Sequence, residues 1–248
     1  MMWPSAICSK HTFRAAAFLM VVLAPPFATS ASVTGEVRLV GSQDAAVRKR
    51  HDLSGVIVWL APADAVPRHV TATRVRMIQK NKRFEPHVLA VDVGTTVDFP
   101  NFDPIFHSAF SNFSGQIFDL SLYPPGTTRS ITFRKPGVVR IFCNIHPTMS
   151  AIIAVLDSPY FAVSDKLGKY EIPNVPPGTY HFHVIHERAT QQTVSKLTRT
   201  IEVSEPAVAL PLITVSESGY LPVPHKNKYG LDYPPESDDV TGYSSQMQ

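Results

Sequence analysis

The chain has 248 residues, 44% of them hydrophobic, and a formal net charge of +3. This length and composition can support a hydrophobic core in one large or two small domains. The charge is small, and no basic run is longer than Arg48-Lys49-Arg50, which argues against binding to nucleic acid.

The first 31 residues resemble a secretory signal peptide. Lys10 and Arg14 precede the apolar run 15–24, and small residues at 28–31 offer a cleavage site. The apolar run is too short to cross a bilayer, which takes about 20 residues. We therefore expect an exported, periplasmic protein without a membrane span after cleavage.

Cysteine usage singles out one thiol. Cys8 would leave with the signal peptide, so Cys143 would be the only cysteine of the mature chain. A lone cysteine cannot form an internal disulfide, and a free thiol is a liability in an oxidising compartment. From the count alone, Cys143 is either an inert buried residue or a functional one.

The remaining sequence predicts an all-β protein, because short runs of β-branched and aromatic residues alternate with Pro, Gly, Asn and Asp. The second predicted strand, at 53–61, is apolar on both faces, so we expect other parts of the protein to cover both of them. Residues 216–248 lack periodicity and are expected to form a disordered or loosely docked flexible tail. Strands are expected at 32–40, 53–61, 74–79, 84–86, 87–93, 96–99, 129–133, 138–142, 150–156, 169–172, 179–186, 197–203 and 208–212.

Four side chains form a pattern of metal ligands. Cys143, His146 and Met149 follow C-x2-H-x2-M spacing in a predicted loop between two strands, and His107 lies 36 residues upstream. Two imidazoles and a thiolate make a trigonal set, and a thioether adds a weak axial ligand, as in blue-copper sites. The pattern predicts one copper ion at these four residues.

Residues 73–157 resemble a cupredoxin domain, the fold of plastocyanin, pseudoazurin and amicyanin. The resemblance rests on F-x-P at 84–86, V-x-x-G-T-x-V-x-F-x-N at 91–101, K-P-G at 135–137, His107 and the loop 143–149. It implies a Greek-key sandwich that binds copper and transfers electrons, with a redox partner protein that it does not identify. The whole chain is also similar to bacterial exported proteins labelled "methylamine utilization" or plastocyanin-like, in which a phrase like 157–162 follows the cupredoxin.

Two residues next to the predicted ligands bear on the reduction potential of the metal. Ser108 follows the first histidine ligand, where single-copper cupredoxins commonly carry asparagine. Pro147 has no N–H to offer the sulfur. Since hydrogen bonds around the ligands tune a metal, we expect a more electron-rich thiolate, which an unchanged reduction potential in Pro147→Ala would contradict.

A second resemblance concerns the flanks. Residues 168–172 and 175–180 look like the second half of a carboxypeptidase-regulatory or transthyretin-like sandwich, and 35–37 with 55–60 look like its first half. We therefore expect 33–66 and 158–215 to form one small split sandwich, with the cupredoxin domain 73–157 inserted. The alternative is two sequential domains, in which Trp59 would pack only on residues 75–155.

The remaining histidines give a weaker signal for metal, and the sequence lacks the common catalytic motifs. His181 and His183 share a strand face, with His186 nearby, so a second metal site is one hypothesis and ordinary strand positions the other. The sequence carries no G-x-S-x-G, H-E-x-x-H or phosphate loop, so we expect no enzyme. A nucleophilic Cys143 paired with His146 would leave Met149 without a role.

The leading hypothesis is an exported type 1 (blue) copper protein that transfers one electron. The first alternative is a periplasmic copper carrier or sensor without redox turnover. The second is a β-sandwich interaction module that does not use metal.

Overall fold

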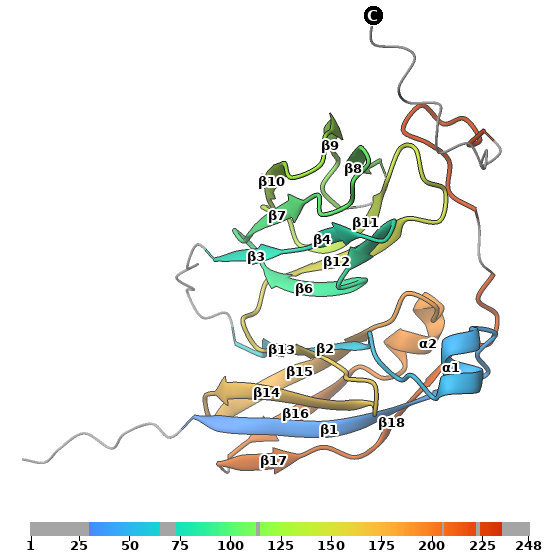
Figure 1. Cartoon of the computed structure of the whole chain (residues 1–248). Coiled ribbons are helices and arrows are strands. Elements are labelled where there is room, and N and C mark those ends of the chain that lie inside the picture. The colour runs from blue at the N-terminus through green and yellow to red at the C-terminus, as the bar shows by residue number, and fades with distance from the viewer. Residues whose placement is uncertain (1–29, 65–72, 113–114, 205, 222–223, 235–248) are drawn as a thin grey trace, which may run out of the picture.

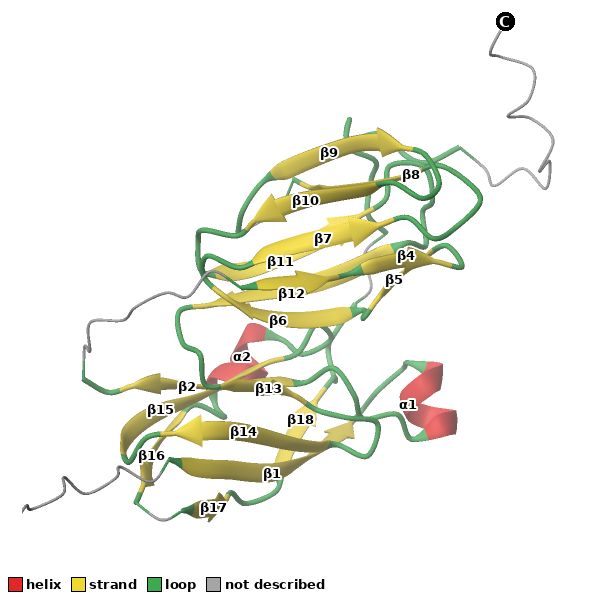
Figure 2. Ribbon diagram, turned by 60° about the vertical axis from the view of Figure 1, so that its left-hand side comes forward, coloured by secondary structure: helices red, strands yellow, loops and turns green. Residues whose placement is uncertain are grey.

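The structure, a computed structural model, describes residues 30–64, 73–112, 115–204, 206–221 and 224–234. Its regular elements are strands apart from two short helices, so the predicted all-β sandwich class is confirmed. Figures 1 and 2 show two stacks of strands, one above the other. We call the stack that contains β3 to β12 the central sandwich, and the stack that contains β1, β2 and β13 to β18 the flanking sandwich.

The central sandwich contains a three-stranded sheet, β10-β7-β3, and a five-stranded sheet, β6-β12-β11-β8-β9, with the small β4–β5 hairpin beside them. Its core is aromatic and aliphatic, and Phe99, Phe133 and Ile153 are fully buried there. The strands are β3 Arg74–Arg76, β4 Ile78–Lys80, β5 Arg83–Glu85, β6 Val88–Asp92, β7 Thr96–Pro100, β8 His107–Ser111, β9 Phe118–Tyr123, β10 Thr128–Thr132, β11 Gly137–Phe142 and β12 Ser150–Leu156.

The flanking sandwich joins segments that are far apart in the sequence. In one sheet β1 lies between β14 and β17 and also pairs with β18, and the other sheet has the order β13-β2-β15-β16. Its core includes Val33, Leu60, Ile172 and Phe182, all fully buried. The strands are β1 Ala31–Val40, β2 Ile57–Pro62, β13 Phe161–Val163, β14 Lys169–Val175, β15 Gly178–Ile185, β16 Arg199–Val203, β17 Ala207–Ala209 and β18 Ile213–Ser216.

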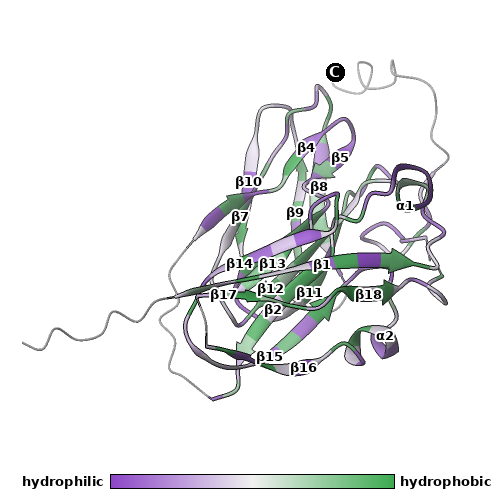
Figure 3. Ribbon diagram, turned by 90° about the horizontal axis from the view of Figure 1, so that it is seen from below, coloured by the Kyte–Doolittle hydropathy of each residue, from purple (hydrophilic) through white to green (hydrophobic). Residues whose placement is uncertain are grey.

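Strand β2 is covered on both faces, as its sequence predicted. Val58 and Leu60 lie in the core of the flanking sandwich. Ile57 lies in a separate cluster with Ala154 and Leu156 of the central sandwich. The ring of Trp59 packs against that cluster and stacks on His183 of β15, with 4.7 Å between centroids. Figure 3 shows the hydrophobic stretches along β2, β12 and β15 in green.

A polar bridge also joins the two sandwiches. His87, just before β6, contacts the carboxylate of Glu187, beyond the end of β15, at 2.9 Å through Nε2. Its Nδ1 lies 3.0 Å from the carbonyl oxygen of Ser150, the first residue of β12. The hydrogen bond to Glu187 raises the pKa of His87 above its ordinary value, although burial opposes the shift.

Six elements were not predicted: helices α1 and α2 and strands β8, β9, β13 and β18. Helices α1 (Ala45–Arg50) and α2 (Gln191–Ser195) are only 6 and 5 residues long, too short to give a period, and capping side chains hold their first turns. Strands β8, β13 and β18 have only 5, 3 and 4 residues, too few for a clear period. Strand β9 was missed although Phe118, Leu120 and Leu122 alternate with polar residues. Strand β2 begins at Ile57 instead of residue 53, because Gly55 has a φ of 87° and interrupts extended backbone.

No helix within the described ranges is long and apolar enough to span a bilayer. The predicted signal peptide, residues 1–31, lies outside the described residues except for its last two positions. Ala31 begins β1.

Gly168, in the turn before β14, provides a test of the close packing of the flanking sandwich. Its φ is 80°, and a Cβ there would lie 2.3 Å from the carbonyl oxygen of Val37. We expect Gly168→Ala to lower the free energy of unfolding by at least about 2 kcal/mol more than Gly219→Ala, where φ is 84° but the nearest atom is at 3.9 Å. Urea unfolding of both variants measures the difference, and equal losses would contradict the predicted clash.

Candidate metal centre

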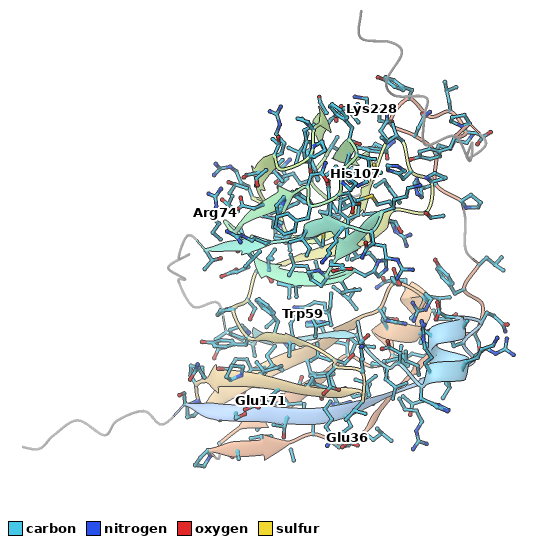
Figure 4. All side chains as sticks on the ribbon, viewed as in Figure 1. Glu36, Trp59, Arg74, His107, Glu171 and Lys228 are labelled. Atoms are coloured by element: carbon cyan, nitrogen blue, oxygen red, sulfur yellow. The ribbon has the colours of Figure 1, made fainter. Side chains whose placement is uncertain are left out.

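The predicted ligands come from two neighbouring strands of one sheet. Strands β11 and β12 pair from Gly137–Val155 to Phe142–Ser150, so the loop 143–149 is the connection of a β-hairpin. Strand β8 pairs with β11 at Phe110–Phe142, and His107 is its first residue. The sheet therefore brings His107 to the end at which the loop emerges, and Figure 4 labels it inside the central sandwich.

Three of the four predicted residues converge. The Nδ1 atoms of His107 and His146 are 3.1 Å apart. The sulfur of Cys143 lies 3.8 Å from the first of these nitrogens and 3.5 Å from the second. All three residues are buried, and within the described residues they form the single group of His, Cys, Asp and Glu side chains whose donor atoms lie close enough to share a metal ion.

The spacing of the three donor atoms fits a metal ion. The point equidistant from the two nitrogens and the sulfur lies inside their triangle, at about 2.0 Å from each, close to the 2.0–2.3 Å of metal bonds to imidazole and thiolate. A planar set of two imidazoles and one thiolate is the donor set of blue-copper proteins. The residues present therefore fit copper.

Met149 is fully buried in the same core cluster as Cys143. Its backbone N–H donates to the carbonyl of His146, and the N–H of Cys143 donates to the carbonyl of Met149, both at 3.1 Å. These two hydrogen bonds hold the two ends of the loop together and fix the backbone positions of its ligand residues. The assignment of the Met149 thioether as axial ligand stays a prediction.

An aspartate that the sequence analysis missed orients His107. The Nε2–H of His107 donates to Asp103 Oδ2 at 2.7 Å, which leaves Nδ1 free to face the other donors. The Asp103 carboxylate also accepts from the backbone N–H groups of Asn81 and Lys82 at 2.6 and 2.8 Å. These hydrogen bonds lower the pKa of Asp103 although burial raises it. A carboxylate four residues before a ligand histidine was the signal available in the sequence.

Ser108, the position where the sequence departs from the cupredoxin pattern, still contacts the sulfur ligand. Its hydroxyl lies 3.8 Å from the sulfur of Cys143 and accepts a hydrogen bond from the N–H of Asn144 at 2.8 Å. The serine therefore joins β8 to the ligand loop at the thiolate. This contact could not be placed from the sequence, because it depends on how β8 and the loop meet.

The electrostatics of the site favour a thiolate. Burial raises the pKa of the Cys143 thiol, but the ring nitrogens of His107 and His146 outweigh it, and the pKa falls to about 5. Backbone N–H groups of Ile145 and Ser108 act in the same direction. Burial lowers the pKa of His107, but Cys143 and Asp103 together raise it.

Residues 224–234, which we call the C-terminal strap, lie against this loop through contacts that the sequence alone does not identify. The hydroxyl of Tyr233 donates to the carbonyl of Cys143 at 2.8 Å. The ring of His225 stacks on Phe142 with 4.1 Å between centroids. Of the two states expected for the tail, disordered or loosely docked, these residues show the docked one.

The other histidines do not converge in the same way. The rings of His181 and His183 are 6.5 Å apart, and Nε2 of His186 instead bonds Glu217 at 2.7 Å. Among the described residues they form no group of donor atoms of the kind seen at Cys143. The structure thus gives no support to the hypothesis of a second metal site.

No protein-family model and no curated protein matches the sequence. Solved structures match it in part. A purple cupredoxin from Nitrosopumilus maritimus is 23% identical over 34% of this chain and 99% of that protein, with a TM-score of 0.31. An oxidised mutant of amicyanin is 20% identical over 33% of this chain and 81% of that one, with a TM-score of 0.32.

A copper-containing nitrite reductase from Thermus scotoductus is 26% identical over 49% of this chain, with a TM-score of 0.34. The match spans only 28% of the reductase. Such TM-scores indicate weak similarity over a third to a half of the chain, so we draw no functional conclusion from these matches.

The role of Asp103 can be tested by replacing its charge. We expect Asp103→Asn to weaken metal affinity by about 10- to 100-fold, because His107 loses the carboxylate that fixes its tautomer and orientation. Competition with a chromogenic chelator measures the affinity. Asp157→Asn, at an exposed carboxylate beyond β12, serves as the control. Equal affinities for the two variants would show that Asp103 does not support the site.

Proposed function

We propose that the central sandwich binds one copper ion through His107, Cys143 and His146, with Met149 as a weak axial ligand. The observation that supports this most directly is the buried triangle of one sulfur and two Nδ1 atoms, with sides of 3.1, 3.5 and 3.8 Å. Copper would supply one-electron exchange between its cuprous and cupric states. We propose that the protein carries that electron to or from a partner protein, without catalysing a reaction.

The surrounding residues favour small rearrangement when the charge at the site changes. His107 belongs to a strand, and the other three residues belong to a hairpin loop closed by its own backbone bonds. Cys143, His107 and Met149 are fully buried, so water has little access to the donor atoms. Ligands held this firmly suit a metal that must change charge without changing geometry.

The alternatives remain a copper carrier or sensor without redox turnover and an interaction module that does not use metal. They differ from the proposal in how the site treats the two oxidation states. An electron carrier binds both in one geometry, a carrier of cuprous ion need not bind cupric ion in this way, and a metal-free module needs no thiolate.

Loading the purified protein with Cu(II) separates these possibilities. We expect an intense blue absorption from thiolate-to-copper charge transfer, which Cys143→Ser should abolish. The control is Ser218→Ala, at an exposed serine distant in sequence from the site. A folded protein that binds Cu(I) but shows no blue band would favour the copper carrier. Absence of binding in either state would remove the proposal.

We also propose that the protein acts after export, on the basis of the charged start, apolar run and small residues within 10–31. Expression of the full chain in a Gram-negative host should give a periplasmic product whose N-terminus lies near residue 32. N-terminal sequencing of the fractionated protein measures this. Recovery of an uncleaved chain from the cytoplasm would contradict export.

A further inference from the structure

The C-terminal strap contacts the ligand loop through two hydrogen bonds to its first residues. The hydroxyl of Tyr233 donates to the Cys143 carbonyl at 2.8 Å, and the backbone N–H of Lys228 donates to Asn144 Oδ1 at 2.9 Å. Strand β11 ends at Phe142, so the Cys143 carbonyl lies just beyond the strand's ladder of hydrogen bonds. The strap thus provides a partner for the main chain of the cysteine ligand itself.

Further contacts anchor the strap on both sides of these bonds. The ring of His225 stacks on Phe142, and the ring of Tyr233 lies edge-on to His225 with 5.2 Å between centroids. The hydroxyl oxygen of Tyr233 is also 3.2 Å from Nδ1 of His225. At the other side, Lys228 Nζ forms a 2.8 Å ion pair with Asp119 of β9. Anchors on β9 and β11 hold Tyr233 in register with the loop.

The strap reaches the loop from the other sandwich. Strand β18 ends at Ser216 in the flanking sandwich, and His225 already contacts Phe142 of the central sandwich. Figure 1 shows this segment in red beside the connection between β11 and β12. The contacts of the strap therefore link the position of the Cys143 backbone to residues about 80 to 90 positions later.

We propose that the C-terminal strap is part of the metal centre, and that Tyr233 is a positioning residue which holds the Cys143 thiolate in place and slows loss of the ion. The proposal rests on the proposed copper function. Its physical basis is that groups bonded to a metal's ligands restrict the ligand geometry, and their removal commonly costs about 10- to 100-fold in affinity. Tyr233 acts on the ligand's backbone, whereas Asp103 and Ser108 act on side chains.

Tyr233→Phe tests the proposal, because it removes the hydroxyl and keeps the ring that packs on His225. Tyr229→Phe is the matched control, since Tyr229 belongs to the same strap but is 70% exposed, and its hydroxyl interacts with Lys228 instead of the ligand loop. We expect Tyr233→Phe to lose Cu(I) to a chelator about tenfold faster than the wild type and to shift the absorption of the Cu(II) form. We expect Tyr229→Phe to match the wild type in both.

A metal-free measurement keeps this test separate from the proposed function. In the metal-free protein, amide hydrogen exchange across Cys143–Met149 should be about tenfold faster in Tyr233→Phe than in Tyr229→Phe, because the loop opens more often. The unfolding midpoints of the two variants should agree. Lys228→Met, which removes the ion pair on β9, should accelerate exchange in the same direction by a smaller factor.

The outcomes divide as follows. If the wild type does not bind copper, the proposed function fails, and the exchange rates alone decide whether the strap holds the loop. If Tyr233→Phe exchanges at the wild-type rate, or if both tyrosine variants change equally, the strap proposal is overturned. Faster exchange accompanied by an equal fall in global stability would also overturn it, because the role would then be merely structural.

Discussion

The antiparallel pairing of β11 with β12 is the constraint on which the candidate metal centre depends. It forces the chain from Cys143 to Met149 into a short connection, and neighbouring β8 brings His107 to the same end of the sheet. A slip of register by one residue would move every side chain of β11 to the opposite face. The alternation of buried Val139 and Ile141 against Ile153 and Val155 excludes that slip.

Burying two imidazoles and a thiol without water is costly unless each polar atom finds a partner. The site meets this requirement by pairing its groups with one another and with Asp103. The lowered pKa of Cys143 favours the thiolate, and the raised pKa of His107 favours the protonated ring beside it. A cation entering the triangle would take over the role of that proton, so metal binding and proton release are coupled.

The sequence revealed those features of the site that are local in the chain. The C-x2-H-x2-M spacing lies within seven residues, and turns and alternation located the strands around it. Asp103 was missed because its role depends on backbone N–H groups of the β4–β5 turn, which no periodicity encodes. The contacts of the strap were missed for a similar reason. Tyr233 lies in a segment without a sequence pattern, and its hydrogen bond to the Cys143 carbonyl is visible only in the folded structure.

The interleaving of the two sandwiches has a consequence for the order in which the chain can fold. All strands of the central sandwich lie between residues 74 and 156, whereas β1 pairs with β14, β17 and β18, and β2 pairs with β13 and β15, which are all made later. During synthesis, the hydrophobic strand β2 therefore stays unpaired while the central sandwich can already form. Strands that are far apart in the sequence pair slowly, so β2 exposes its hydrophobic side chains and unpaired backbone for longer than the strands of the central sandwich do. A chaperone that binds the nascent chain would therefore be expected to bind at β2.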